Sequence, residues 1–167
     1  MEIRYRKAEL ADLDAIERLV QQAVKGMLSQ GIDQWDELYP VREDFEKDIQ
    51  SGQMSLGILG GEISVIYTIN GECEPEYESA EWKSPDKSYC ILHRLCVNPV
   101  FQNQGIARQT MEHIEREAAA KGIQAIRLDV FSRNLHALKL YQNCGFKKVG
   151  TARWRKGEFY LMEKYLP

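Results

Sequence analysis

Several features that would place this chain of 167 residues in common protein classes are scarce in its sequence. No apolar run approaches the roughly 20 residues that a membrane-spanning helix needs. The formal net charge is -3, so no basic excess points to nucleic-acid binding. Residues 1–4 alternate like a strand and contain no signal-peptide core, so we expect a cytoplasmic protein without a membrane partner.

Metal-binding patterns are also scarce. The chain has 3 histidines and 4 cysteines, and the cysteines are scattered without Cys-x-x-Cys pairs. This spacing argues against a zinc site, so we expect no metal. Free thiols in a reducing compartment fit the pattern better than disulfides.

What the chain does have is enough apolar residues, 44%, for a sizeable core. We predict a single domain over residues 1–167. Apolar periodicity and turn residues predict its elements. They are a strand at 3–7, a helix from 12 to near 31, a short helix at 41–50, strands at 54–59 and 62–70, a central strand at 88–97, a helix at 105–121, a strand at 123–131, a short helix after Asn134, and a hairpin of 146–154 with 158–166.

Strand, crossover helix and strand imply a parallel pair, so the order predicts a mixed α/β domain with antiparallel flanks. Gly60-Gly61 is expected to make a tight hairpin turn. The acidic segment 71–87 is expected to be irregular, either as a functional loop or as a mobile one. Without a bulge, the central strand would place Leu95 and His93 on one side and Arg94 on the other.

A loop at 102–108 leaves the central strand and enters the following helix. Pro99 ends the strand because it lacks an N–H, and small residues at 105 and 107 let a ligand approach the backbone closely. The first N–H groups of a helix have no intrahelical partner and lie at the positive end of its dipole. The layout suits a phosphate group, although an ordinary strand-loop-helix connection shares these features.

Two motifs resemble those of the GCN5-related N-acetyltransferase (GNAT) superfamily. The first is Gln102-x-x-Gly105-x-Ala107 after the strand end Leu95-x-Val97-x-Pro99. The second is Asn134-x-x-Ala137-x-x-x-Tyr141-x-x-x-Gly145-Phe146. The resemblance covers essentially the whole chain. It implies the acyl-CoA N-acyltransferase fold, an α/β mixed sheet with antiparallel flanks and a parallel central strand pair that splays after a bulge.

The resemblance also implies acetyl-CoA as the cosubstrate. Backbone N–H groups of Leu95 and Val97 would meet the thioester and the pantetheine, with the Leu95 N–H stabilising the thioester oxygen. Tyr141 would protonate the leaving thiolate or stabilise its charge, with a buried aromatic that only anchors the short helix as the alternative. Asn134 would either face the pantetheine or only cap its helix. The diphosphate would be bound mostly through the main chain of Gln102, Asn103, Gln104, Gly105, Ile106, Ala107 and Arg108.

A base must remove a proton from the amine acceptor. Family members often use a glutamate on the central strand, and this strand has none. His93 is the available substitute, because an unperturbed imidazole titrates near neutrality. A structural role for His93 stays open, as do Tyr39 or Glu72 acting through water. Cys96 lacks a paired base and is expected to be inert, which favours direct transfer.

We therefore expect an N-acetyltransferase that acts on a primary amine of a small molecule or a peptide N-terminus. A non-catalytic acyl-CoA-binding or sensing domain is the alternative. The acceptor pocket would draw on aromatic residues of the least transferable regions, and core packing is the other role open to these side chains. The candidates are Trp35, Tyr39, Tyr77, Trp82 and Trp154. The C-terminal hairpin offers an edge strand for a possible homodimer.

Overall fold

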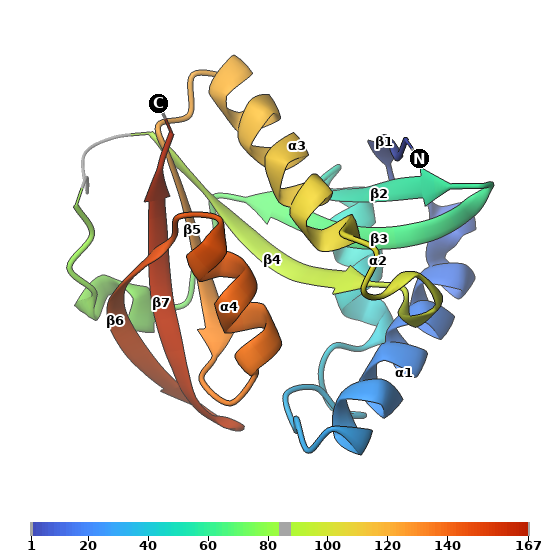
Figure 1. The fold of residues 1–167 in the computed structure, drawn as a ribbon, viewed down its shortest axis with the longest axis horizontal. Helices are drawn as coiled ribbons and strands as arrows, with labels where there is room; N and C mark the ends of the chain where they lie inside the picture. The colour runs from blue at the N-terminus through green and yellow to red at the C-terminus, as the bar shows by residue number, and fades with distance from the viewer. Residues whose placement is uncertain (1, 84–87, 167) are drawn as a thin grey trace. The chain divides into compact units, whose positions relative to one another are not determined.

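The computed structural model describes residues 2–83 and 88–166 as an α/β protein with a seven-stranded sheet, labelled in Figure 1. The strand order is β1-β2-β3-β4-β5-β7-β6, with β4 and β5 parallel and antiparallel pairing on the flanks. The chain forms two compact units. Unit 1 comprises Met1–Ile69 with Arg94–Thr110, and unit 2 comprises Asn70–His93 with Met111–Pro167.

Unit 1 contains the three N-terminal strands and two helices. Its elements are β1 (Arg4–Lys7), α1 (Leu13–Ser29), α2 (Arg42–Gln50), β2 (Met54–Leu59), β3 (Glu62–Asn70, ending at the unit boundary), short 3-10 helices at Leu10–Asp12 and Pro99–Phe101, the last part of β4 (Tyr89–Val97) and the start of α3 (Ile106–Ala120). Gly60 and Gly61 form the turn between β2 and β3, and their φ values of 59° and 80° are those that the tight hairpin requires.

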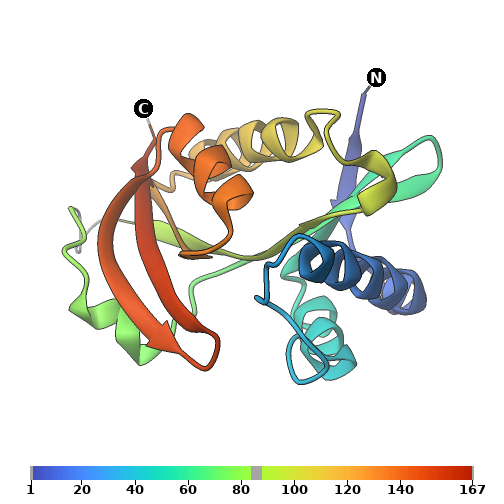
Figure 2. The same ribbon diagram turned by 60° about the horizontal axis from the view of Figure 1, so that its bottom comes forward.

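Two apolar clusters hold unit 1 together. In the first, α1 and α2 (blue and cyan in Figure 2) contribute Ile16, Leu19 and Phe45, which pack with Leu56 and Ile66 of the strands. In the second, Ile3, Val65 and Ile106 form a core that Leu95 and Val97 join. The end of β4 and the start of α3 are therefore anchored in the same core, which fixes the loop between them.

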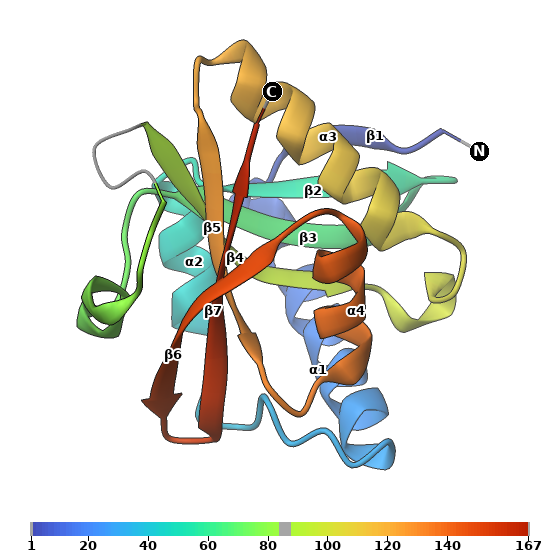
Figure 3. The same cartoon turned by 60° about the vertical axis from the view of Figure 1, so that its left-hand side comes forward.

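Unit 2 contains the C-terminal strands. Its elements are the first part of β4, the rest of α3, β5 (Ala125–Phe131), α4 (Leu135–Asn143), β6 (Lys147–Trp154), β7 (Gly157–Tyr165) and a 3-10 helix at Pro75–Ser79. Figure 3 shows β5, β7 and β6 side by side, and β7 pairs antiparallel with both neighbours. The described parallel pairing joins Tyr89–Ile91 to Ala125–Arg127.

These elements confirm the predicted order, with boundaries that differ by a few residues. The 3-10 helix at Pro75–Ser79 falls inside the segment expected to be irregular, and residues 84–87 of that segment lie outside the described residues. A regular β4 was the expectation in the absence of a bulge, and the structure differs at Arg94, whose φ is 50°. Within residues 2–83 and 88–166, no helix is long and apolar enough to cross a membrane.

Candidate active site

The loop between β4 and α3 has an unusual backbone. Asn103 and Gly105 both have left-handed conformations, with φ of 62° and 77°. A Cβ added at Gly105 would meet nothing within 4 Å, so the space beside it is open. The first intrahelical bond runs from the N–H of Gln109 to the carbonyl of Gly105, and the N–H groups of residues 106–108 belong to the first turn, where the helix offers no acceptor. Such a helix start with open space beside it favours binding of an anion such as a phosphate.

The side chains of residues 102–108 differ in how deeply they are buried. Ile106 is buried in the second cluster of unit 1 and holds the helix start, while Ala107 is half-buried. Gln102 uses its own N–H for a 3.2 Å bond to the carbonyl of Pro99. The side chains of 102–104 and of Arg108 are exposed. A ligand would therefore meet backbone and exposed polar groups at this loop.

Leu95 and Val97 lie at the end of β4 in the same unit. Their side chains are half-buried against Ile3, Val65 and Ile106, so the side chains serve packing. Any role toward a thioester would fall to the backbone N–H groups. The loop and both of these residues lie in unit 1, and the remaining predicted site residues, His93, Asn134 and Tyr141, lie in unit 2.

Arg94, which the motifs did not single out, joins two other side chains of unit 1 in a polar network. Its Nε and Nη2 donate to the two carboxylate oxygens of Asp48 at 2.7 and 2.8 Å, and its Nη1 donates to the hydroxyl of Tyr39 at 2.8 Å. Burial lowers the pKa of Arg94, but the hydrogen bonds and the charge of Asp48 outweigh it, so the pKa lies above its ordinary value. A lone arginine within an apolar strand was the sequence signal that a buried partner was needed.

His93 lies in unit 2, half-buried on β4. Its Nε2 is 2.8 Å from Oδ1 of Asn70 and 3.0 Å from the backbone carbonyl of Glu72. A carbonyl oxygen can only accept, so Nε2 carries the proton and donates. Any proton taken up by a neutral His93 would therefore enter at Nδ1. The structure thus fixes the tautomer that a basic His93 would have.

Tyr141 lies on α4 and is 8% exposed. Burial raises the pKa of its phenol, and the charge of Asp129 adds to the effect. Its ring packs against Phe146 with centroids 5.9 Å apart in an edge contact. Tyr141 is therefore a neutral phenol held in fixed orientation, able to donate a proton or a hydrogen bond.

Asn134 caps α4. Its Oδ1 accepts from the backbone N–H of Ala137 at 3.1 Å, which confirms the capping role. Because the cap uses the oxygen, a contact with a pantetheine would be made by the side-chain NH2 as a donor.

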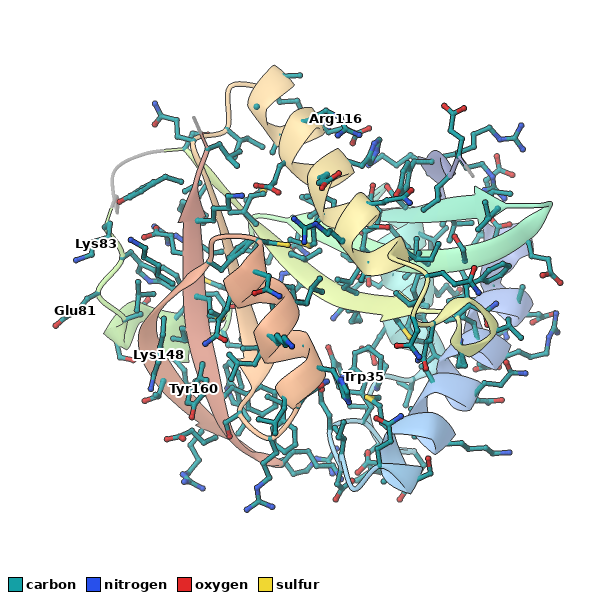
Figure 4. The ribbon with its side chains drawn as sticks, viewed as in Figure 1. Trp35, Glu81, Lys83, Arg116, Lys148 and Tyr160 are labelled. Carbon is teal, nitrogen blue, oxygen red and sulfur yellow. The ribbon has the colours of Figure 1, made fainter. Side chains whose placement is uncertain are left out.

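The aromatic candidates for an acceptor pocket mostly pack in cores. Trp35, labelled in Figure 4, is 8% exposed and belongs to the cluster of α1 and α2. Tyr77 stacks on Trp82 at 5.5 Å, lies 6.5 Å from the ring of Trp154 and donates its hydroxyl to Asp129 at 2.7 Å. Tyr39 is 39% exposed and is the most accessible of the five.

Cys96 is buried at 6% exposure in the first cluster of unit 1. Burial raises the pKa of its thiol to about 12, so the thiol is protonated at neutral pH. The nucleophilic form of a cysteine is the thiolate. Cys96 is thus unsuited to attack a thioester, in line with its predicted inertness.

Comparison with known proteins shows that this chain is similar to acetyltransferases. Residues 65–146 match the model of the Acetyltransferase (GNAT) family. A 62-residue stretch is 32% identical to ribosomal protein bS18-alanine N-acetyltransferase of Escherichia coli K12. That stretch covers 37% of this chain and 42% of the relative, so less than half of the relative is matched.

Solved structures share the fold. An acetyltransferase of the GNAT family from Streptococcus agalactiae superposes with a TM-score of 0.87 at 22% identity, covering 98% of this chain and 95% of that one. The PaiA N-acetyltransferase from Thermoplasma acidophilum, in complex with coenzyme A, gives 0.73 at 18% identity and covers 99% of both chains. At these identities the likeness shows the fold alone.

Proposed function

We propose that this chain, which carries a GNAT acetyltransferase domain and the fold of that family, transfers acetyl directly from acetyl-CoA to a primary amine. The observation that carries the proposal is the loop at the start of α3. Its left-handed residues Asn103 and Gly105 and the first turn of α3 form a backbone site suited to a diphosphate.

Acetyl-CoA would supply an activated acyl group on a thioester. In the proposed reaction the amine nitrogen bonds to the acyl carbon, the carbon-sulfur bond breaks, and the sulfur leaves as a thiolate. The N–H of Leu95 would stabilise the oxygen that becomes negative in between. Tyr141 would protonate the leaving sulfur or stabilise its charge with its O–H, and a tyrosinate left by the transfer would regain its proton from water. Burial raises the pKa of Tyr141, which keeps the phenol protonated between turnovers.

The proton lost by the amine needs an acceptor. His93 is the proposed base, and Nδ1 is the atom that would receive the proton because Nε2 already donates to the carbonyl of Glu72. Tyr39, or Glu72 acting through water, are the other candidates. Tyr39 already accepts a hydrogen bond from Arg94, which leaves its own hydroxyl proton to be donated elsewhere.

The acceptor is proposed to be a small-molecule amine or the N-terminus of a peptide. The Escherichia coli relative is named as an alanine N-acetyltransferase that acts on a ribosomal protein. Peptides with an N-terminal alanine therefore belong among the first acceptors to test. In the strand order β6 is an edge strand, so pairing of two copies through β6 is the proposed route to a homodimer, which light scattering would detect.

The test is release of free CoA thiol from acetyl-CoA over a panel of small amines and peptides, with CoA binding measured separately by calorimetry. Acceptor-dependent thiol release would support the proposal, and mass spectrometry would identify the acetylated nitrogen. Binding of CoA without turnover on any acceptor would favour the acyl-CoA-sensing alternative. Failure to bind CoA would reject both functions.

A further inference from the structure

Arg94 has a backbone conformation that its residue type does not favour. Of the non-glycine residues that the structure describes, two have a positive φ: Asn103 at 62° and Arg94 at 50°. Asparagine visits the left-handed region readily, whereas a side chain such as arginine adopts it rarely because Cβ crowds the following carbonyl. The conformation of Arg94 therefore needs support from its surroundings.

The support comes from α2. Asp48 is 4% exposed, and its two carboxylate oxygens receive Nε and Nη2 of Arg94 in a bidentate pair. Thr68 of β3, itself fully buried, donates its hydroxyl to Oδ2 of Asp48 at 2.9 Å, which orients the carboxylate. A bidentate pair fixes both the position and the plane of the guanidinium.

This arrangement is a poor explanation for stability alone. A buried ion pair contributes little compared with apolar residues of the same volume, because both charges lose their hydration. The main effect of the pair is to hold the Arg94 guanidinium in one plane. The plane of the Arg94 guanidinium limits the path of its side chain, and hence the φ that its backbone can adopt.

The backbone of Arg94 bears directly on the proposed reaction. Its φ and ψ orient the peptide plane between residues 94 and 95, which carries the N–H of Leu95. In a regular strand that N–H would point across to the neighbouring strand, as a ladder hydrogen bond requires. A left-handed residue immediately before it turns the peptide away from that direction, as in a β-bulge.

We propose that Asp48 is a positioning residue that holds Arg94 in its left-handed conformation and so aims the N–H of Leu95 at the thioester oxygen. The inference rests on the proposed transferase function for its kinetic consequence. Asp48 itself touches neither substrate in this role. Thr68 supports Asp48, and Tyr39 holds the third nitrogen of the guanidinium.

The decisive experiment compares three variants: Asp48→Asn, Asp48→Asn with Arg94→Ala, and Asp48→Asn with Arg94→Gly. Asparagine keeps the volume of Asp48, and glycine adopts a positive φ without strain. We expect kcat to fall in the first two variants and to be roughly five- to thirty-fold higher in the glycine variant than in the alanine variant, the factor for relieving one left-handed residue. KM for acetyl-CoA should stay the same in all three.

Equal kcat in the glycine and alanine variants would overturn the inference, because a purely structural or charge-based role gives glycine no advantage. Should the double variants not fold, Arg94→Lys is the second test, because it keeps the charge and loses the bidentate fork. An unchanged kcat in Arg94→Lys would equally overturn the inference.

A second readout separates this inference from the proposed function. The three-bond coupling between the amide and α protons of residue 94 reports φ by NMR without any turnover. We expect this coupling and the Leu95 amide shift to change in Asp48→Asn, with the Leu95 amide shift returning towards its parent value in the glycine double variant. If the parent chain turns over no acceptor but these signals behave as expected, the function fails and the positioning role stands. If the signals do not move, the positioning role fails.

Discussion

The phenol of Tyr141 is the side chain whose environment bears most directly on chemistry. Burial and the charge of Asp129 both oppose its ionisation, so its pKa lies above the ordinary value of about 10. An acid is active while protonated and loses activity as pH rises through its pKa. Tyr141 should therefore cause no loss of activity below about pH 10, and any fall in rate with increasing pH in the neutral range must come from another group.

Replacing Tyr141 by phenylalanine keeps the edge contact with Phe146 and removes only the hydroxyl. We expect kcat to fall about 100-fold, the lower end for a general acid, while the Kd for CoA stays unchanged. Single-turnover thiol release and calorimetry measure the two quantities. Tyr160→Phe is the control: this ring lies 4.1 Å from Nζ of Lys148 on the hairpin, both labelled in Figure 4, and losing its hydroxyl should leave kcat unaltered. A Tyr141→Phe variant with the parent rate in the chemistry-limited regime would remove Tyr141 from the mechanism.

For His93, the pH dependence of kcat/KM is the informative measurement. A base must be deprotonated, so kcat/KM should fall as the pH drops through the pKa of that base. His93→Gln should lower the rate and abolish that acidic limb. His136→Gln, at an exposed histidine of α4, is the matched control and should keep the profile of the parent. An identical profile in His93→Gln would remove His93 as the base and leave it a structural role, to which its hydrogen bonds to Asn70 and Glu72 belong.

The connection between β4 and α3 depends on glycine for its shape. At Gly105 φ is 77°, so an alanine there would be strained by about 1–2 kcal/mol although its Cβ would meet no neighbour. We expect Gly105→Ala to raise the Kd for CoA about five- to thirty-fold, because the loop must distort and the methyl group occupies the open side.

The turn that follows α3 supplies the control for this loop. Gly122 has φ of 76° and equally open surroundings, so Gly122→Ala imposes the same strain away from residues 102–108. Both variants should lose similar stability by thermal unfolding, and only Gly105→Ala should lose CoA affinity in calorimetry. Equal Kd values in the two variants would contradict a phosphate-binding role for the loop.

Local sequence patterns predicted the helices and strands well because each element has its own pattern of apolar and turn residues. The stripe of α1, the alternation of β1 and the Gly60-Gly61 turn are all properties of neighbouring residues. The 3-10 helix at Pro75–Ser79 was missed because its order comes from tertiary packing of Tyr77 under Trp82 and Trp154. Turn composition alone does not reveal such contacts.

The candidate site shows the same division. The loop at 102–108 and the cap at Asn134 were predictable because each uses consecutive backbone groups. The pair of Asp48 and Arg94 joins residues 46 positions apart, and only the presence of a lone arginine in an apolar strand hinted that a partner existed. Which acid would serve depended on how α2 packs on the strands, and that is decided by the fold of unit 1.

The four cysteines report on folding of the whole chain, because they lie at different depths in its two units. Cys73 is exposed, whereas Cys90 and Cys96 are buried, and burial raises the pKa of their thiols to about 11 and about 12. At pH 8 the buried pair is therefore protonated as well as covered, and alkylation needs the thiolate. We expect iodoacetamide to modify Cys73 in the native chain and to leave Cys90 and Cys96 unmodified over the same time, as measured by mass spectrometry of digested protein. In denaturant all four should react at comparable rates, which controls for intrinsic reactivity.

Because Cys90 belongs to unit 2 and Cys96 to unit 1, labelling of one before the other in partial denaturant would show that the units unfold separately, and simultaneous labelling would show that they unfold together. Rapid native labelling of Cys96 would contradict its burial and reopen a covalent acetyl-enzyme route.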